Sequence, residues 1–197
     1  KILWIVALDL TDESYGNATG IGCADFATRR LTGRASLQVA VQPGAKQLVL
    51  DTRDLVISAV RAEQPLPFAL GPAHGDFGSA LTIELPAAPP ASAPPSTSNG
   101  ARELWIHVDY STSPGAAALQ WLAPEQTAGG KSPFLFTQSQ AILARTWVPC
   151  QDSPGVRMTY GARITVKSPA GGPPLLAVMS ASNPQRAAAD GVYTFDM

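Results

Sequence analysis

The chain has 197 residues, of which 45% are hydrophobic and 15% are charged, and its formal net charge is -1. This composition excludes a disordered protein, and the near-neutral charge leaves no field to draw the chain onto nucleic acid or an anionic membrane. The length is enough for one substantial core, so we expect a single domain over residues 1–197.

The first apolar segment covers residues 2–8 (ILWIVAL) and ends at Asp9. It is too short to span a bilayer, and we interpret it as a buried first or edge strand. Its place behind Lys1 also resembles part of a secretory signal. Because the chain opens on Lys1 rather than Met, we expect it to derive from a longer protein.

Short alternating segments dominate the rest of the chain. Residues 35–41 (ASLQVAV) alternate apolar and polar side chains with a period of two, which predicts a half-buried strand. Helical periodicity is weak, and only residues 138–145 are a candidate for a short helix or turn. The pattern predicts an all-β fold with little helix. We expect mostly antiparallel, saddle-like sheets, similar to a β-sandwich. Further strands are predicted at 47–50, 55–60, 80–85, 103–110, 134–137, 157–166, 175–179 and 192–195.

Residues 86–100 are rich in proline, alanine and serine, which favours an extended, solvated chain. We interpret this segment as a long loop within the domain rather than a linker, because neither flank alone could bury an adequate core. We expect the core to contain the aromatic side chains of Trp121, Phe134, Phe136, Trp147 and Tyr160.

The cysteines and histidines do not form a recognisable metal site. Cys23 and Cys150 lie far apart and outside any CxxC pair, which excludes a zinc knuckle. The pair could form one disulfide, but two reduced, packed thiols are the favoured interpretation. His107 lies on a predicted strand and should face solvent or a polar neighbour, whereas His74 lies in a glycine-rich segment and should be exposed.

Asp152 is the residue most open to a catalytic interpretation. It precedes Ser-Pro, which is turn chemistry, so we expect it to cap a turn or to pair with Arg145. No acid–base pair or activated nucleophile can be assembled around it, and we assign no catalytic residue to this chain.

Two glutamines follow the predicted aromatic strand. Gln138 and Gln140 each offer one acceptor oxygen and two donor hydrogens, and residues two apart on an extended chain point the same way. Such a pair could line a cleft that reads a peptide amino-terminus without adding a charge. The alternative is that both amides satisfy buried backbone groups.

Several motifs occur in the same order as in a known family: residues 25–37 (DFATRRLTGRASL), 119–127 (LQWLAPEQT), 133–142 (PFLFTQSQAI) and 147–154 (WVPCQDSP). From about Asp25 onward the chain resembles the amino-terminal domain of the M1 zinc aminopeptidases, in the branch of leukotriene A4 hydrolase and aminopeptidase B. The resemblance implies that Gln140 helps to hold the substrate amino end. It implies that Gln138 contacts the first side-chain pocket or backbone, and that the Ala141 backbone approaches the substrate.

The zinc motif of that family, His-Glu-x-x-His with a downstream Glu, is not found in these 197 residues, and neither is Gly-x-Met-Glu-Asn. The resemblance therefore implies a substrate-cleft domain, inactive alone. Zinc would belong to the parent enzyme, whose catalytic and C-terminal domains would be the partners. A cytoplasmic location is expected. The alternative is a stand-alone, non-catalytic β-sandwich that serves as a binding or scaffold module.

Overall fold

The computed structural model of the chain describes residues 22–87, 102–156, 160–166, 175–182 and 191–196. The expected strand at 2–8 and nearly all of the proline-rich loop at 86–100 lie outside the described residues, as does the first part of the strand expected at 157–166. These parts of the prediction are therefore not tested.

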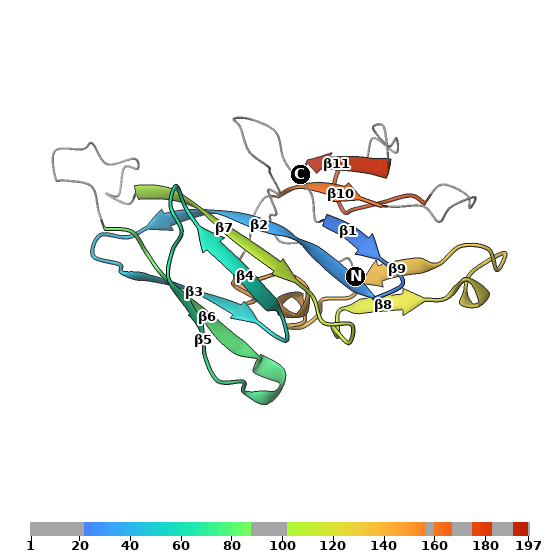
Figure 1. Ribbon diagram of the computed structural model, residues 1–197, viewed down its shortest axis with the longest axis horizontal. Coiled ribbons are helices and arrows are strands. Elements are labelled where there is room, and N and C mark those ends of the chain that lie inside the picture. The colour runs from blue at the N-terminus through green and yellow to red at the C-terminus, as the bar shows by residue number, and fades with distance from the viewer. Residues whose placement is uncertain (1–21, 88–101, 157–159, 167–174, 183–190, 197) are drawn as a thin grey trace.

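The described residues form four antiparallel sheets (Figure 1). This confirms the predicted all-β, mostly antiparallel fold. The largest sheet has the order β1-β2-β7-β4, with β1 (Gly22–Asp25), β2 (Arg30–Val41), β7 (Arg102–Ser111) and β4 (Val56–Arg61). A second sheet has the order β3-β6-β5, with β3 (Gln47–Thr52), β6 (Ser79–Glu84) and β5 (Phe68–Leu70). Two hairpin sheets pair β8 (Leu119–Leu122) with β9 (Phe134–Thr137), and β10 (Gly161–Thr165) with β11 (Val192–Asp196).

Helix is limited, in the part of the chain that the structure describes, to three single 3-10 turns. These are η1 (Gly75–Phe77), η2 (Pro124–Gln126) and η3 (Ala144–Thr146). None of them is long enough to cross a membrane. The short helix or turn expected within 138–145 is confirmed, because this segment consists of turns that lead into η3.

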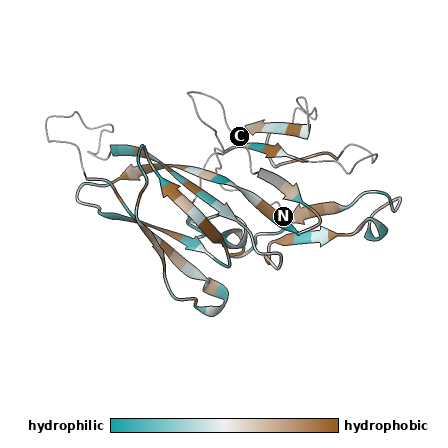
Figure 2. Cartoon of the chain, in the orientation of Figure 1, coloured by the Kyte–Doolittle hydropathy of each residue, from teal (hydrophilic) through white to brown (hydrophobic). Residues whose placement is uncertain are grey.

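The long pair β2 and β7 forms the centre of the fold. Its register runs without interruption from Thr32 opposite Ser111 to Val41 opposite Arg102. Buried and more exposed residues alternate along β7, as the period-two pattern requires, and Figure 2 shows apolar and hydrophilic residues alternating along the strands of this sheet. One face of the sheet is therefore apolar along its whole length.

That apolar face is shared by two cores. At one end, Leu37, Ile106 and Val108 pack against Leu81 and Ile83 of the sheet β3-β6-β5. At the other end, Leu31, Ala35 and Tyr110 pack against the segments that follow β8 and against the β10–β11 hairpin. The second core lies directly beneath the chain that leaves β9, and so it supports the candidate site.

The expected aromatic core is only partly correct. Trp147 and Tyr160 are 2% and 5% exposed, and Trp121 is partly buried against the same core. Phe134 and Phe136 are 52% and 42% exposed, so their assignment to the core is wrong. Alternation along β9 turns the side chains between and after them, Leu135 and Thr137, away from the exposed face. A four-residue strand cannot bury both sets.

Two other differences from the prediction concern strand boundaries. Residues 175–179 form no strand: Leu176 and Val178 are 71% and 72% exposed, while Met179 is buried in the core. Conversely, β5 and β8 were not among the predicted strands, because three or four residues carry too little alternation to be detected. The motif at 25–37 lies in the β1–β2 hairpin.

Candidate functional site

The candidate site is the segment that follows β9, residues 138–141, which we call the amide loop. The Gln138 backbone N–H donates to the Ala118 carbonyl at 2.9 Å, which extends the β8–β9 pairing by one residue. Alternation then continues past the strand: Gln138 and Gln140 are exposed, and Ser139 between them is 8% exposed. Both glutamines are therefore presented on the outer side, and Ala141 beside them is exposed as well.

The two glutamine side chains differ in which hydrogen-bonding groups remain unused within the loop. The Gln138 Oε1 accepts a hydrogen bond from the Gln140 backbone N–H at 3.2 Å, so its oxygen is used within the loop and its NH2 group remains as an outward donor. The Gln140 side chain makes no hydrogen bond to any residue that the structure describes. With respect to the part of the chain that the structure describes, its acceptor and both of its donors are available to a ligand. The peptide bond between Gln140 and Ala141 is cis.

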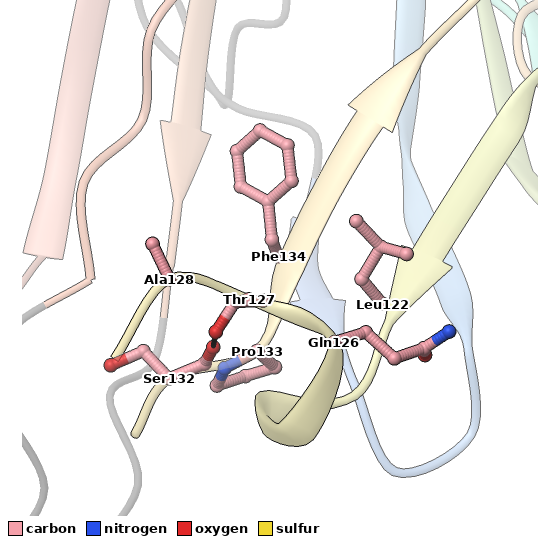
Figure 3. Close-up of a pocket in the computed structure, with 7 residues that line it drawn as sticks. All are labelled: Leu122, Gln126, Thr127, Ala128, Ser132, Pro133 and Phe134. Carbon is pink, nitrogen blue, oxygen red and sulfur yellow. Dashed lines mark hydrogen bonds between the residues drawn. The ribbon is translucent and has the colours of Figure 1, made fainter. Parts of the chain in front are cut away.

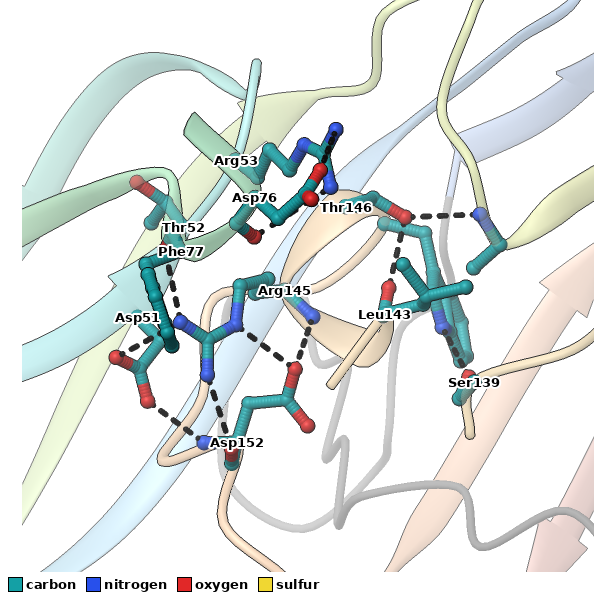
Figure 4. Close-up of polar contacts among 12 residues, drawn as sticks. Asp51, Thr52, Arg53, Asp76, Phe77, Ser139, Leu143, Arg145, Thr146 and Asp152 are labelled. Carbon is teal, nitrogen blue, oxygen red and sulfur yellow. Dashed lines mark hydrogen bonds and ion pairs between the residues drawn. The ribbon is translucent and has the colours of Figure 1, made fainter. Parts of the chain in front are cut away.

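Ser139 attaches the amide loop to the core. Its Oγ accepts a hydrogen bond from the indole Nε1–H of Trp147 at 3.1 Å, and its carbonyl accepts one from the Leu143 backbone N–H at 2.9 Å (Figure 4). The Trp147 side chain is 2% exposed. The residue between the two amides is thus held by a side chain that is itself fixed within the core.

Thr146 connects the same turn to the start of β8. Its Oγ1 donates to the Leu143 carbonyl at 2.7 Å and accepts from the Ala118 backbone N–H at 3.1 Å. The carbonyl of Ala118 in turn accepts from Gln138. These bonds join η3, the strand β8 and the amide loop into one hydrogen-bonded unit.

Arg145 anchors this unit to the sheet β3-β6-β5. Its buried guanidinium donates from Nε to Asp152 Oδ2 at 3.0 Å, from Nη2 to the Asp152 carbonyl at 3.0 Å, and from Nη1 to the Phe77 carbonyl at 2.8 Å (Figure 4). The Asp51 carboxylate of β3 lies 3.5 Å from Nη1. The predicted pairing of Asp152 with Arg145 is confirmed: Oδ2 of this carboxylate accepts from the Arg145 backbone N–H and from its Nε, which is a structural role.

Backbone bonds reinforce the same contact. The Asp51 backbone N–H donates to the Cys150 carbonyl at 2.8 Å, and the Arg53 backbone N–H donates to the Arg145 carbonyl at 2.8 Å. The Asp152 backbone N–H donates to the Asp51 carboxylate at 2.9 Å. The segment after the amide loop is therefore clamped along β3 by main chain and side chain together.

Cys150 is a packed, free thiol. Burial raises its pKa strongly, the Asp152 and Asp51 carboxylates raise it further, and Arg145 lowers it. A thiol whose pKa is raised is not an activated nucleophile. The prediction of a packed, reduced thiol is confirmed for Cys150.

The histidines lie as expected. His74 is exposed, and the ring Nδ1 of His107 lies 2.7 Å from the Ser36 Oγ on the outer face of the large sheet. Burial lowers the pKa of His107, as do Arg61 and Arg34, against an opposing effect of Asp109. Among the described residues, no three His, Cys, Asp or Glu side chains gather where they could hold a metal ion. The described residues therefore do not supply a zinc ligand set.

A shallow hollow lies at the other end of β9 from the amide loop (Figure 3). Its lining offers apolar surface, hydroxyls and one amide but no titratable side chain, so it carries no acid–base chemistry. The lining residues are Leu122, Gln126, Thr127, Ala128, Ser132, Pro133 and Phe134.

Between this hollow and the amide loop, β9 exposes two aromatic side chains. The rings of Phe134 and Phe136 are 5.9 Å apart at their centroids, and we call this pair the aromatic ribbon. By the alternation of the strand, the aromatic ribbon and Gln138 share one face. Sequence reasoning placed these rings in the core and missed the ribbon, because residues 134–136 are all apolar and nothing in this run marks which face is exposed.

Comparison with known proteins gives consistent relatives. The profile of the peptidase M1 N-terminal domain matches residues 23–195. Leukotriene A-4 hydrolase of Xenopus laevis is 40% identical over 80% of this chain and 24% of its own length. Leucine aminopeptidase 2 of Yarrowia lipolytica is 39% identical over 74% and 21%, and aminopeptidase B of Rattus norvegicus is 35% identical over 91% and 26%. The chain thus spans about a quarter of the length of these relatives.

Solved structures give a similar result. Native yeast LTA4 hydrolase superposes with a TM-score of 0.70 and 26% identity, over 88% of this chain and 25% of that one. An M1 zinc metallopeptidase from Deinococcus radiodurans shares the fold, with a TM-score of 0.57 and 18% identity over 85% of this chain and 34% of that one.

Proposed function

Because the chain belongs to the peptidase M1 N-terminal domain family, and within it to the leukotriene A4 hydrolase-like aminopeptidases, we propose that the amide loop forms part of the wall that binds the amino end of a peptide substrate. The observation that carries the proposal is the pattern of exposure. Gln138 and Gln140 are exposed on either side of a buried Ser139, so that two amides face outward from one fixed point.

The amides suit such a ligand chemically. A peptide amino-terminus is an ammonium group that needs acceptors, and the free Oε1 of Gln140 is an acceptor that brings no second charge into the site. Gln138 has its oxygen engaged and its NH2 free, which suits a carbonyl of the substrate backbone. We assign the ammonium to Gln140, the adjacent backbone or first side chain to Gln138, and a backbone approach to Ala141.

The role of this chain is to bind and orient the substrate. We propose that the parent enzyme removes amino-terminal residues from peptides, as the names of the related aminopeptidases suggest. The described residues do not offer a zinc ligand set, so we assign no step that involves the metal to them. Holding the scissile bond in a productive geometry is a contribution to rate in its own right.

The aromatic ribbon favours this assignment over a stand-alone β-module. Two large apolar side chains, Phe134 and Phe136, are about half exposed beside the amide loop. A self-sufficient module has no reason to leave such a surface open, whereas a domain that packs against a catalytic domain does. We propose that the partner of the ribbon is the remainder of the parent enzyme.

The test is a kinetic comparison in the full-length enzyme. Gln140→Ala should lower kcat/KM for an aminoacyl p-nitroanilide by about 10-fold or more, which corresponds to about 1–2 kcal/mol. Gln64→Ala is a matched control, because Gln64 is also exposed and lies in the turn after β4. If Gln140→Ala and Gln64→Ala both leave kcat/KM unchanged, the amide loop does not bind substrate.

A further inference from the structure

We propose that Ser139 and Trp147 are a positioning pair that sets the direction of the two amides through one buried hydrogen bond. The proposal rests on the proposed function, because it concerns how the same loop is held in a binding geometry. It assigns a role to two residues that do not themselves touch substrate.

The first step of the argument is the position of Ser139. It is the residue between Gln138 and Gln140, and it is the one member of the amide loop that is buried. In an extended chain, turning one residue inward turns both of its neighbours outward. The orientation of Ser139 therefore determines the orientation of both glutamines at once.

The second step is the specificity of the bond to Trp147. An indole offers a single polar hydrogen, which can only be donated, and here it points at the Ser139 Oγ at 3.1 Å. Both side chains are buried, so water cannot take the place of either partner. If the serine turned outward, a buried donor would be left without an acceptor, which opposes that rotation.

The third step is the rigidity of Trp147. Its backbone N–H donates to the Ala144 carbonyl at 3.0 Å at the end of η3, and Val148 N–H donates to the same carbonyl at 3.0 Å. The middle residue of η3, Arg145, is fixed to Asp152 and to the Phe77 carbonyl. The turn that carries the indole is therefore itself attached, through Arg145, to Asp152 and Phe77 (Figure 4).

A fourth observation explains why the bond is needed. Within the described residues, the Ser139 carbonyl accepts from the Leu143 N–H at 2.9 Å, and this bond holds only the main chain. The bond through Oγ adds a constraint on the direction of the Ser139 side chain. Together the two bonds define the plane of the loop against the core.

The test is a set of variants in the full-length enzyme: Ser139→Ala, Trp147→Phe, the double variant, and Gln140→Ala alone and combined with Ser139→Ala. Each single change at the pair should lower kcat/KM for an aminoacyl p-nitroanilide by about 3- to 30-fold, mainly through KM. The kcat/KM of the double variant should be no lower than that of the less active single variant, because both substitutions remove the same hydrogen bond. In the Gln140→Ala background, Ser139→Ala should lose the part of its effect that acts through Gln140, so that the two effects combine to less than their product.

Ser36→Ala is the matched control. Ser36 is a buried serine, 2% exposed, whose Oγ is hydrogen-bonded to a ring nitrogen at 2.7 Å on the outer face of the large sheet. It should lower thermal stability as Ser139→Ala does, yet leave KM unchanged. Ser139→Thr, which keeps the acceptor oxygen, should restore most of the lost kcat/KM.

The outcomes separate this proposal from the function on which it rests. If Gln140→Ala lowers kcat/KM but Ser139→Ala and Trp147→Phe do not, the amides bind substrate and the positioning pair is wrong. If the effects of Ser139→Ala and Gln140→Ala multiply independently, Ser139 does not act through the amide and the proposal is overturned. If Gln140→Ala has no effect, the proposed function fails first. Should Ser139→Ala not accumulate as a folded enzyme, Trp147→Phe decides by the same criteria.

Discussion

The guanidinium of Arg145 donates from Nε to the Oδ2 of Asp152 at 3.0 Å, and both side chains are buried, at 7% and 10% exposure. The two lie seven positions apart in sequence, yet Arg145 also reaches Phe77 of η1 and Asp51 of β3. A contact that is local in sequence thus fixes the segment after the amide loop to a distant part of the fold.

Removing this arginine should be costly. Arg145→Ala leaves the Asp152 carboxylate buried without its cation and the Phe77 carbonyl without its donor, and we expect a loss of about 3–5 kcal/mol in the free energy of unfolding. Arg145→Lys keeps the charge but not the forked donors of the guanidinium. Its free energy of unfolding should lie between those of the wild type and Arg145→Ala. Urea unfolding measures both. Arg53→Ala is the control: its partner Asp76 is 85% exposed, so the change should be below about 1 kcal/mol.

Gly78 follows η1 with a φ of +71°, and a Cβ at this position would lie 2.1 Å from the Thr52 carbonyl oxygen and 2.7 Å from the Arg53 Cβ. Gly78→Ala should therefore lower the free energy of unfolding by about 2–4 kcal/mol. Gly44 has a φ of +81° with no atom within 4 Å of a built Cβ, and Gly44→Ala should lose only about 1 kcal/mol. If Gly78→Ala and Gly44→Ala lose equal stability in urea unfolding, a Cβ at residue 78 does not clash with the Thr52 carbonyl of β3.

His107 should make stability depend on pH. Burial, Arg61 and Arg34 lower its folded pKa, and only Asp109 opposes them, so the folded chain favours the neutral ring. The unfolded chain binds a proton more readily, since the pKa of a free histidine is about 6.5. The contribution is therefore fully present above that value and is lost as the pH falls from about 6.5 through the lower folded pKa.

Urea unfolding of the wild type and His107→Gln measures this effect at about pH 7.5 and about pH 5.5. The variant should lose less stability between the two values than the wild type does. An equal loss in both proteins would mean that the burial of the ring and the two arginines do not act on its titration.

Cys150 should react only slowly with thiol reagents in the folded chain. Its side chain is fully buried and its pKa is raised, so both access and thiolate fraction are low. In a Cys23→Ser background, we expect reaction with Ellman's reagent at about pH 8 to be slow in the native state and complete within minutes in denaturant. Rapid stoichiometric labelling of the native protein would contradict the burial of this thiol.

The sequence predicted the long elements well. Ten paired residues in β2 and β7 carry enough alternation to be recognised, whereas β5 has only three residues and its burial depends on its neighbour β6. Phe134 and Phe136 were misassigned because hydrophobicity alone does not say which face of a strand is covered. The segment 175–179 shows the converse: its alternating residues pack against the core, yet the segment is not a strand.

Some residues of the candidate site were predicted from the sequence, and others were not. Gln138, Gln140 and Ala141 were found through family motifs, and the pairing of Arg145 with Asp152 through turn chemistry. The contact of Ser139 with Trp147 follows no sequence rule, because it joins two residues eight apart across an irregular turn. Such a contact becomes visible only when the path of the chain between its partners is known.

The exposure of residues 134–140 alternates from Phe134 to Gln140, in step with the strand. A substitution at any of these positions changes one side chain and leaves the rest in place. An insertion or deletion of one residue between the aromatic ribbon and the amide loop would invert the facing of one relative to the other, so that the aromatic rings and the amides would no longer share one face. The length of this segment is therefore fixed more strictly than its composition, and variants of the site should differ by replacement and not by insertion.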